Sequence, residues 1–364
     1  MLPEPEANAL AASAMLLERM RAELKAGGNW IGFPRYMELA LYEPGLGYYA
    51  GGSAKLGAPG DFATAPEMGT LFARTLSRQV AEILQPGEAI LEFGAGSGAL
   101  AEALIADLSP ENYLILETSA ELRARQEARL GKRARWIERL PKRFRGVMLA
   151  NEVADAMPVH ALAWRVNGIM ERGVNDKLAW AERPASGELL VAARRIEVPV
   201  PYASEIGLVG RAWMRLLAAR LERGALLVID YGFPQREYYH PQRSMGTLMC
   251  HYRHRAHGDP FFHPGLQDIT AHVDFSALAQ ASREGGLEVL GYASQAQFLV
   301  NCGITELLEQ EDASDAVRYA PRAGEAQKLL SPAEMGELFK VLAVGRGVQR
   351  PLLGFASGDR SPSL

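Results

Sequence analysis

The sequence predicts an α/β fold centred on a doubly wound, mostly parallel sheet of seven strands. Three observations predict it. Short apolar runs alternate with helical segments along most of the chain, which is typical of a parallel sheet with helices on both faces. A glycine-rich turn at 94–98 joins one apolar run to a helix. The length of 364 residues suffices for one such domain with insertions, or for two domains of roughly 150 residues each.

The expected strands are short apolar runs at 89–93, 113–116, 135–137, 146–150, 225–230, 287–292 and 339–344. Helices are predicted where apolar residues recur at three- and four-residue steps, at 7–24, 66–84, 99–108, 120–130, 203–222 and 275–284. The close succession of strand and helix between 89 and 150 favours parallel neighbours, because a parallel pair needs a crossover connection.

Two stretches interrupt this alternation and are predicted to be insertions. In 164–200, turn-forming pairs such as Asn167-Gly168 predict antiparallel hairpins. The second stretch, 233–273, is rich in His, Tyr, Arg and Pro. The predicted organisation starts with a helical and loop cap at 1–66 and ends with a loose tail at 355–364. Between them, the core has three parts, 67–163, 201–232 and 274–354, separated by a β-rich insertion at 164–200 and a substrate-side insertion at 233–273.

The composition is that of an ordinary soluble globular protein. The chain has 39 Lys and Arg against 43 Asp and Glu, a formal charge of −4, with 48% hydrophobic and 23% charged residues. These values argue against a disordered, collagen-like or coiled-coil chain. The lack of a basic excess weighs against nucleic acid as a partner, although local basic patches stay possible on these numbers.

The sequence predicts a cytoplasmic protein. Cys250 and Cys302 are the only cysteines, too few for a disulfide framework. No apolar run approaches the ~20 residues that a membrane-spanning helix needs, so no membrane insertion is expected. The N-terminus carries Glu4, Glu6 and Glu18 and lacks the pattern of a secretory or organelle-targeting segment. The oligomeric state stays open, a homodimer included.

A cofactor site is predicted at the turn Gly94-Ala95-Gly96-Ser97-Gly98, where missing Cβ atoms let the backbone approach a ligand. Two ligands fit the pattern. A dinucleotide favours Ala99 at the sixth position and an acid about 20 residues on, which Glu117 supplies. S-adenosylmethionine enzymes favour an acid two residues before the first glycine, here Glu92, and the spacing of Gly94, Gly96 and Gly98.

The segment 151–158, directly after the strand at 146–150, favours the second ligand. Sites in open α/β sheets lie at the carboxyl ends of the strands. Asn151, Glu152 and Asp155 would lie there, and clustered carboxylates suit a cationic or nitrogen nucleophile better than the proton relay of a nicotinamide enzyme. A helix cap at Asn151 with early-turn acids is the alternative.

Six stretches of the chain, spread over nearly its whole length, resemble the MidA family of S-adenosylmethionine-dependent methyltransferases: 42–49, 60–67, 92–98, 151–158, 229–232 and 268–275. This family includes the mitochondrial protein arginine methyltransferase that assists assembly of respiratory complex I. The resemblance implies a Rossmann-like methyltransferase with an N-terminal helical cap and two insertions. It also implies a protein substrate methylated on an arginine side chain, as part of complex I assembly.

We therefore expect catalytic roles for Glu152 and Asp155, with Glu67 as a third candidate. The guanidinium of arginine stays charged at any working pH, and carboxylates can pair with it through two parallel hydrogen bonds. The cofactor is expected to be S-adenosylmethionine, and the residues expected to bind it are Asp61, Glu92, Gly94, Ala95, Gly96, Gly98, Glu117 and Asn151.

Three alternatives stay open. They are a methyltransferase for a small molecule, acting on nitrogen or oxygen, a non-catalytic assembly factor that binds S-adenosylmethionine, and a nicotinamide dehydrogenase. No metal is expected, because the histidines of 250–257 and the residues Asp259, His263, Asp268 and His272 match no common zinc spacing. We interpret the histidine-rich stretch as a substrate-facing or cap-closing loop, or as an ordinary hydrated one.

Overall fold

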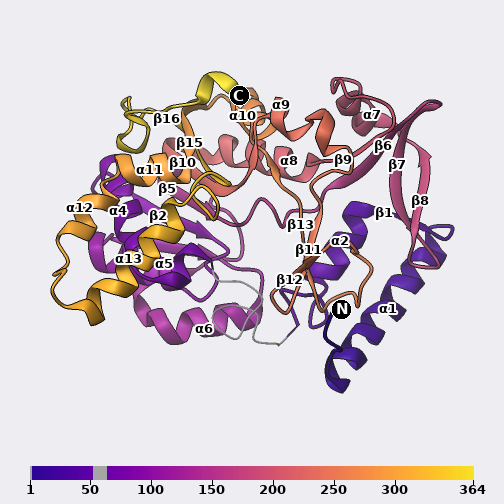
Figure 1. The fold of residues 1–364 in the computed structure, drawn as a ribbon, viewed down its shortest axis with the longest axis horizontal. Coiled ribbons are helices and arrows are strands. Elements are labelled where there is room, and N and C mark those ends of the chain that lie inside the picture. The colour runs from indigo at the N-terminus through magenta and orange to yellow at the C-terminus, as the bar shows by residue number, and fades with distance from the viewer. Residues whose placement is uncertain (1, 52–63) are drawn as a thin grey trace. The chain divides into compact units, whose positions relative to one another are not determined.

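The computed structural model describes residues 2–51 and 64–364, and Figure 1 draws the chain as a ribbon. The described chain divides into two compact units. Among the described residues, unit 1 comprises 2–51, 155–212 and 233–274, and unit 2 comprises 64–154, 213–232 and 275–364. Each unit is therefore assembled from segments that lie far apart in the sequence.

The main sheet of unit 2 runs in the order β15-β16-β10-β5-β2-β3-β4. Its strands are β2 (Ala89–Phe93), β3 (Asn112–Leu116), β4 (Arg135–Trp136), β5 (Phe144–Asn151), β10 (Leu221–Phe233), β15 (Glu288–Ser294) and β16 (Phe339–Arg346). The pairs β3·β4, β2·β3, β2·β5 and β5·β10 are parallel, whereas β16 pairs antiparallel with both β10 and β15. An α/β fold with a largely parallel sheet is thus confirmed.

The predicted count of seven strands needs correction, because the described residues give this sheet eight. The eighth is β14 (Val273–Asp274), which has only two residues and therefore too short a pattern to be predicted from alternation. The sheet is also mixed, because β16 is antiparallel to both of its neighbours, β10 and β15.

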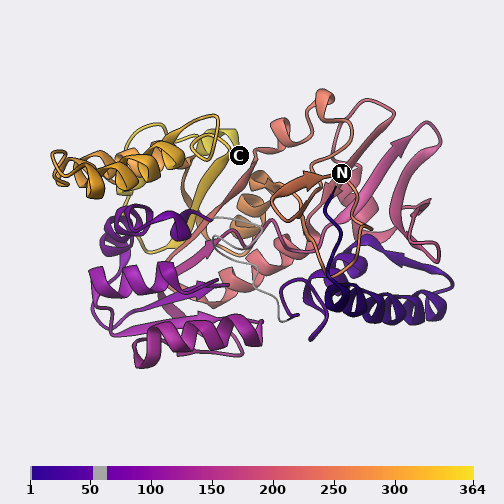
Figure 2. The same ribbon diagram turned by 60° about the horizontal axis from the view of Figure 1, so that its bottom comes forward.

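Helices α5 (Ala99–Leu108) and α6 (Ala120–Leu130) have the predicted bounds, whereas the helix predicted at 66–84 is divided into α3 (Ala65–Met68) and α4 (Leu71–Ile83). The main apolar core of unit 2 joins α4 and α5 to alternate residues of the strands, such as Ile90, Leu149 and Leu227. This alternation is the period of two that a pleated strand imposes. Helix α10 (Phe275–Glu284) contacts β15 and β16. Figure 2 shows the helices of unit 2 on both sides of its sheet.

The C-terminal part of unit 2 adds three helices that the sequence prediction did not include: α11 (Gln295–Asn301), α12 (Ile304–Glu309) and α13 (Ala316–Leu330). All three contact α4. The same core holds the residues Phe298, Ile304 and Leu329 from these helices. They enlarge the core on the face that α4 and α5 cover.

Unit 1 contains α1 (Ala7–Ala26), α2 (Phe33–Tyr42), α7 (Gly187–Ala193), α9 (Gln235–Tyr238) and two small sheets. The first sheet is antiparallel and pairs β1 (Trp30–Gly32), β7 (Gly168–Asn175), β6 (His160–Arg165) and β9 (Tyr202–Ile206) in that order, with β8 (Trp180–Pro184) also on β7. The predicted hairpins of 164–200 are present, although 187–193 forms a helix.

The predicted helix at 203–222 is wrong at its start, over 203–207. Residues Tyr202–Ile206 form strand β9, and helix α8 starts only after Gly207 and spans Leu208–Arg220. All five residues of β9 are buried, so neither the alternation of a half-buried strand nor a clear helical stripe marks the boundary.

The histidine-rich insertion is not a plain loop. It contains a three-stranded antiparallel sheet of β12 (Arg255–His257), β11 (Met249–Tyr252) and β13 (Asp268–Thr270). In the described part of the chain, no group of three or more His, Cys, Asp or Glu residues is placed to hold a metal ion.

The tail after Gly354, predicted to be loose, packs on unit 2. Phe355 is buried in the main core, and a Cβ on Gly291 of β15 would lie 2.2 Å from its ring. Beyond it, Asp359 accepts a hydrogen bond from Tyr292 N–H, and Arg360 N–H donates to the Tyr292 carbonyl. The one glycine in this strand therefore provides the space into which an aromatic ring of the tail fits.

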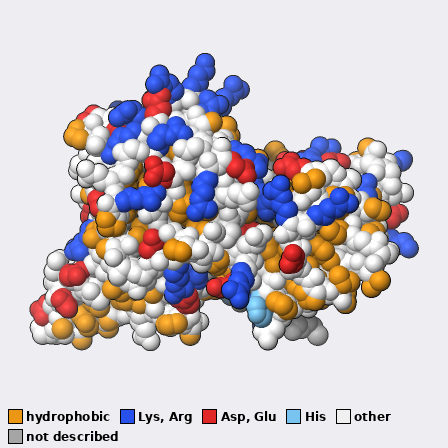
Figure 3. All heavy atoms as spheres, turned by 90° about the horizontal axis from the view of Figure 1, so that it is seen from above, with side chains coloured by type: hydrophobic (Ala, Val, Ile, Leu, Met, Phe, Trp, Pro, Cys, Tyr) orange, Lys and Arg blue, Asp and Glu red, His pale blue; other side chains and the backbone are white. Residues whose placement is uncertain are grey.

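Charged side chains on the surface are largely intermixed. Figure 3 shows Lys and Arg side chains across one face, with several gathered at its upper edge and acidic side chains among them. In the basic segment of α6 and the residues after it, Arg123, Arg125 and Arg133 are each paired with a glutamate. None of the helices described is both long and apolar enough to cross a membrane.

Candidate active site

The glycine-rich turn of unit 2 links the end of β2 to the first residue of α5. Gly94, Gly96 and Gly98 have φ values of +56°, +56° and +82°, a region that side chains with a Cβ rarely adopt. Gly94 N–H donates to the carbonyl of Leu116, at the end of β3, over 3.1 Å. Ala95 is 7% exposed and packs its methyl group into the core, so only its backbone is available to a ligand.

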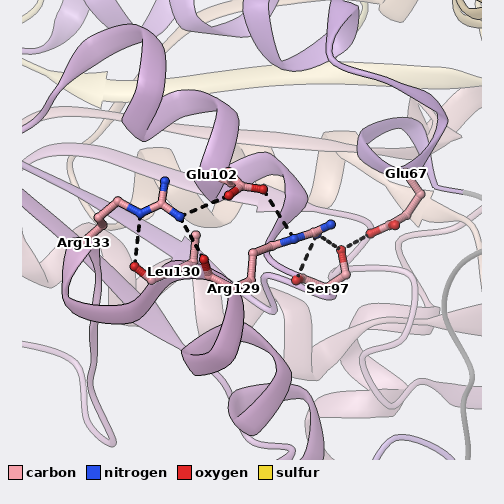
Figure 4. A network of polar contacts seen from close by, with 6 residues as sticks. All are labelled: Glu67, Ser97, Glu102, Arg129, Leu130 and Arg133. Atoms are coloured by element: carbon pink, nitrogen blue, oxygen red, sulfur yellow. Dashed lines mark hydrogen bonds and ion pairs between the residues drawn. The ribbon is translucent and has the colours of Figure 1, made fainter.

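Glu67, predicted to be a catalytic candidate, is held on this turn (Figure 4). It belongs to the short helix α3 (Ala65–Met68), and its carboxylate accepts a hydrogen bond from the Ser97 hydroxyl. Arg129 of α6 donates to the Ser97 hydroxyl over 2.7 Å and to the Ser97 carbonyl over 3.1 Å. Arg129 and Arg133 also pair with Glu102 of α5. The network fastens α3, the turn, α5 and α6 together.

Glu117 follows β3 directly and lies beside the turn. Its carboxylate accepts hydrogen bonds from Ser119 N–H and from the Gln126 side chain, both over 2.9 Å. The same Gln126 amide donates to the carbonyl of Gly96 over 2.9 Å. Burial raises the pKa of Glu117, and the hydrogen bonds from Ser119 and Gln126 act in the opposite direction. The acid is thereby fixed relative to the turn.

Glu92 occupies a different environment, although sequence reasoning grouped it with Glu117. The Glu92 residue is 4% exposed, and its carboxyl accepts a hydrogen bond from the Tyr113 hydroxyl over 2.7 Å. Burial raises its pKa to about 7, the Tyr113 hydrogen bond opposes that rise, and the charge of Glu117 adds to it. This hydrogen bond ties the Glu92 side chain to β3, and its predicted contact with the cofactor stays a prediction.

The acidic loop begins where β5 ends. Asn151 Nδ2 donates to Glu152 over 3.2 Å, and Glu152 N–H donates to the carbonyl of Ile229 on β10 over 2.9 Å. Glu152 has φ of +53°, a left-handed conformation that is uncommon for a residue with a side chain. Such strain is concentrated at functional sites.

Asp230 at the carboxyl end of β10 holds the same loop in place. Its carboxylate accepts hydrogen bonds from the N–H groups of Ala154 and Tyr231, both over 2.9 Å, and the residue is fully buried. Asp155, the second predicted catalytic acid, belongs to unit 1. It is 6% exposed, and its negative charge contributes to the raised pKa of Tyr49, behind burial as the main cause.

The arrangement in unit 2 fits a nucleoside cofactor with a ribose. Three glycines in left-handed conformation leave the ligand side of the turn free of Cβ atoms. A fixed carboxylate follows the next strand, where ribose hydroxyls need an acceptor. Within residues 2–51 and 64–364, the buried Oδ1 of Asn151 has no hydrogen-bond partner, so an acceptor stays available at the same edge of the sheet. Asp61, also predicted to bind the cofactor, lies outside the described residues.

Sequence reasoning did not find Gln126, Ser97 or Arg129. Gln126 could have been noticed, because it occupies an inward position of an amphipathic helix, four residues before the buried Leu130. A polar side chain at such a position needs partners within the protein. The roles of Ser97 and Arg129 depend on tertiary contacts and leave no comparable pattern.

Three comparisons agree with this geometry. A family profile described as "Putative S-adenosyl-L-methionine-dependent methyltransferase" matches residues 71–293. Protein arginine methyltransferase NDUFAF7 homolog, mitochondrial, from Drosophila melanogaster is 28% identical and is aligned over 97% of this chain and 91% of its own length. The crystal structure of a Burkholderia thailandensis protein bound to S-adenosyl-homocysteine is 49% identical, covers 100% of both chains and has a TM-score of 0.96.

The profile spans more than half of the chain, and the ligand of the Burkholderia protein is the product form of the methyl donor that the glycine-rich turn predicts. The dehydrogenase alternative, which needs a nicotinamide cofactor, is thereby set aside. This chain belongs to the family of S-adenosylmethionine-dependent methyltransferases.

Proposed function

We propose that this enzyme is a protein arginine N-methyltransferase whose acceptor is a protein subunit of the respiratory complex I type. Two similar proteins support the acceptor. The relative from Drosophila melanogaster and one from Danio rerio, 28% identical over 90% of this chain, are both named protein arginine methyltransferase. The observation that carries the proposal is the acidic loop after β5, where Glu152 is held in a strained conformation beside Asn151.

The cofactor is proposed to lie over the turn at 94–98. The turn would take the methionine part and Glu117 the ribose hydroxyls, with Asn151 Oδ1 as a further acceptor. Ser97 belongs to this turn, and its hydrogen bond to Glu67 would hold the Glu67 carboxylate at the edge of the cofactor site. When bound, S-adenosylmethionine supplies a methyl group on a positively charged sulfur, which leaves as a neutral thioether.

Glu152 is proposed to bind the acceptor. Its carboxylate would pair with the guanidinium, which fixes the orientation of one nitrogen. The carboxylate also draws the positive charge of the guanidinium toward the nitrogen that it pairs with, which leaves the lone pair of the other terminal nitrogen more available for methyl transfer, and negative charge nearby favours loss of the proton afterwards. No metal is needed for this displacement, and positioning supplies most of the rate. Asp155 is proposed as a second carboxylate for the same group.

The test compares Glu152→Gln and Asp155→Asn with Glu127→Gln. Glu127 is on α6 and pairs with Arg123 on the surface, so its variant controls for the loss of one charge. Each protein is incubated with labelled S-adenosylmethionine and a lysate of cognate cells lacking the enzyme. We expect a labelled protein with methylarginine for the control and at least a 100-fold slower transfer for the other two, with S-adenosylhomocysteine affinity within threefold of wild type.

The outcomes separate the alternatives. Label in a small molecule alone would overturn the protein acceptor in favour of a small-molecule methyltransferase. No label in any fraction, with normal cofactor affinity, would favour an assembly factor that uses the cofactor as a ligand. Full turnover in both acidic variants would remove Glu152 and Asp155 from the mechanism.

We also propose that the protein is located in the cytoplasm. Its support is that both cysteines, Cys250 and Cys302, are free and buried, and burial raises the pKa of each thiol. Buried neutral thiols are unreactive and need no partner for a disulfide. Fractionation of cells that express the tagged protein, followed by immunoblotting, tests this location.

A further inference from the structure

One side chain joins the two halves of the cofactor site in unit 2. Gln126 of α6 is fully buried, and its amide makes three hydrogen bonds of 2.9 Å. Nε2 donates to the carbonyl of Gly96 and to Glu117 Oε2, and Oε1 accepts from Trp136 Nε1. A buried amide with all these partners is held in one place, because losing any of them leaves a polar group unsatisfied.

The indole of Trp136 decides which way the amide faces. An indole N–H can only donate, so the atom of Gln126 that it meets must be the oxygen. The two N–H groups of the amide are then left for Gly96 and Glu117, which both present acceptors. The orientation of a glutamine amide is otherwise ambiguous, and here the chemistry of its three partners fixes it.

We propose that Gln126 is a positioning residue for the methyl donor, with one amide that sets both the glycine turn and the ribose-binding carboxylate. Glu117 is held from two sides, by Gln126 at one oxygen and by Ser119 N–H at the other. The spacing between Gly96 and Glu117 is therefore fixed before the donor binds, which lowers the cost of ordering the site. The inference rests on the cofactor site proposed above.

The chemistry of the amide predicts which replacements fail. In Gln126→Glu the shape is kept, but the oxygen that replaces Nε2 would face the Gly96 carbonyl and the Glu117 carboxylate, which are both acceptors. In Gln126→Met the volume is kept and both connections are lost. Trp136→Phe leaves Gln126 in place and removes the donor that orients it.

The experiment is titration calorimetry of the full-length protein with S-adenosylhomocysteine. We expect the affinity to fall at least 30-fold for Gln126→Glu, about tenfold for Gln126→Met and about threefold for Trp136→Phe. The matched control is Gln295→Met, since Gln295 is also fully buried and donates to the Leu329 carbonyl. We expect this control to lower the melting temperature as Gln126→Met does and to leave the affinity within twofold of wild type.

A double-mutant cycle with Glu117→Gln separates positioning from a merely structural role. If Gln126 acts through Glu117, the double variant Gln126→Met/Glu117→Gln binds less than threefold more weakly than Glu117→Gln alone. Additive losses in this cycle would overturn the coupling. The Trp136→Phe and Gln126→Glu proteins keep the test valid if Gln126→Met does not fold.

The failures can be told apart. Wild-type affinity in Gln126→Met and Gln126→Glu, together with weakened binding in Glu117→Gln, would overturn the role of Gln126 and leave the cofactor site in place. Wild-type affinity in Glu117→Gln and Gly96→Val as well would show that the cofactor binds elsewhere, and the proposed site would fall with this inference.

Discussion

Glu92 lies on β2 and Glu117 directly follows the neighbouring parallel strand β3, and both were predicted to bind the cofactor, yet their surroundings differ. Glu92, on β2, is sealed against β3 with a tyrosine hydroxyl as its partner. Glu117, just past β3, is partly exposed and is tied to the turn through the Gln126 amide. Burial raises the pKa of both acids.

The difference shows that the partner side chain, more than the position in the motif, decides the role of each acid. Burial raises the pKa of Tyr113 well above its ordinary value, so its hydroxyl keeps its proton and can donate to Glu92 alone. An amide has two N–H groups, and Gln126 uses them to connect Glu117 to Gly96. Glu92 is thus buried beside a tyrosine hydroxyl, and Glu117 is half-exposed and connected to the glycine-rich turn.

The largest effect is expected at the turn that both acids flank. Gly96→Val should lower the affinity for S-adenosylhomocysteine at least 1000-fold, roughly 4 kcal/mol. A branched side chain would occupy the space of the methionine part, and φ of +56° disfavours it. Calorimetry measures the affinity. Gly87→Val is the control, since Gly87 has φ of +79° and an added Cβ there meets nothing within 4 Å. An affinity loss below tenfold in Gly96→Val would contradict the assignment.

The next effect concerns stability and sharpens the contrast at Glu92. The Glu92 pKa is about 7 in the folded protein, raised from an ordinary 4.5. Between these values the folded state holds a proton that the unfolded state has lost, so the free energy of unfolding falls as the pH rises from 4.5 to 7. At ~1.4 kcal/mol per pKa unit, the loss is about 3 kcal/mol. Glu92→Gln has no titrating group at this position and therefore removes this dependence of stability on pH.

Urea unfolding of wild type and Glu92→Gln at pH 5 and pH 8 measures this difference. We expect Glu92→Gln to be the more stable protein at pH 8, with a smaller change between the two pH values than wild type. The Glu102→Gln variant, in which an exposed acid of α5 is changed, serves as the control. Equal pH dependence of wild type and Glu92→Gln would refute the buried, proton-holding state of Glu92.

The Glu117→Gln variant tests whether Glu117, and not Glu92, binds the cofactor. Glu117→Gln should weaken S-adenosylhomocysteine about 30-fold, because hydrogen bonds to a charged group contribute about 2 kcal/mol. Glu92→Gln should bind it within threefold of wild type. Calorimetry at pH 8 compares the two proteins. Equal losses of affinity in both variants would erase the distinction between the two carboxylates.

The smallest effect is expected for Tyr113→Phe. Removing the hydroxyl takes away the hydrogen bond that holds down the Glu92 pKa, so the pKa should rise further and the fall in stability should extend above pH 7. At pH 8 the loss of unfolding free energy should be about 1 kcal/mol, with cofactor affinity unchanged. Urea unfolding between pH 5 and 9 measures the free energy of unfolding against pH. The same dependence on pH in Tyr113→Phe and wild type would show that the hydroxyl has no influence on the Glu92 pKa.

Much of unit 2 was predictable because its signals are local. The residues 89–93, 99–108 and 120–130 have the predicted elements within one residue, since apolar period and glycine punctuation decide them. Strand β9 escaped prediction because it is buried on both faces. In the site, glycines and acids were visible from their spacing. The different surroundings of Glu92 and Glu117 were not predictable from spacing, because they depend on Tyr113 and on Gln126, nine residues beyond Glu117.

The packing of Phe355 over Gly291 makes the last ten residues a cover for the sheet. Removal of the residues after Gly354 would uncover the space above Gly291 of β15 that Phe355 fills. It would also remove the partners of the Tyr292 N–H and carbonyl, which are Asp359 and Arg360. Residues 355–360 therefore complete both the apolar packing and the backbone hydrogen bonding of β15.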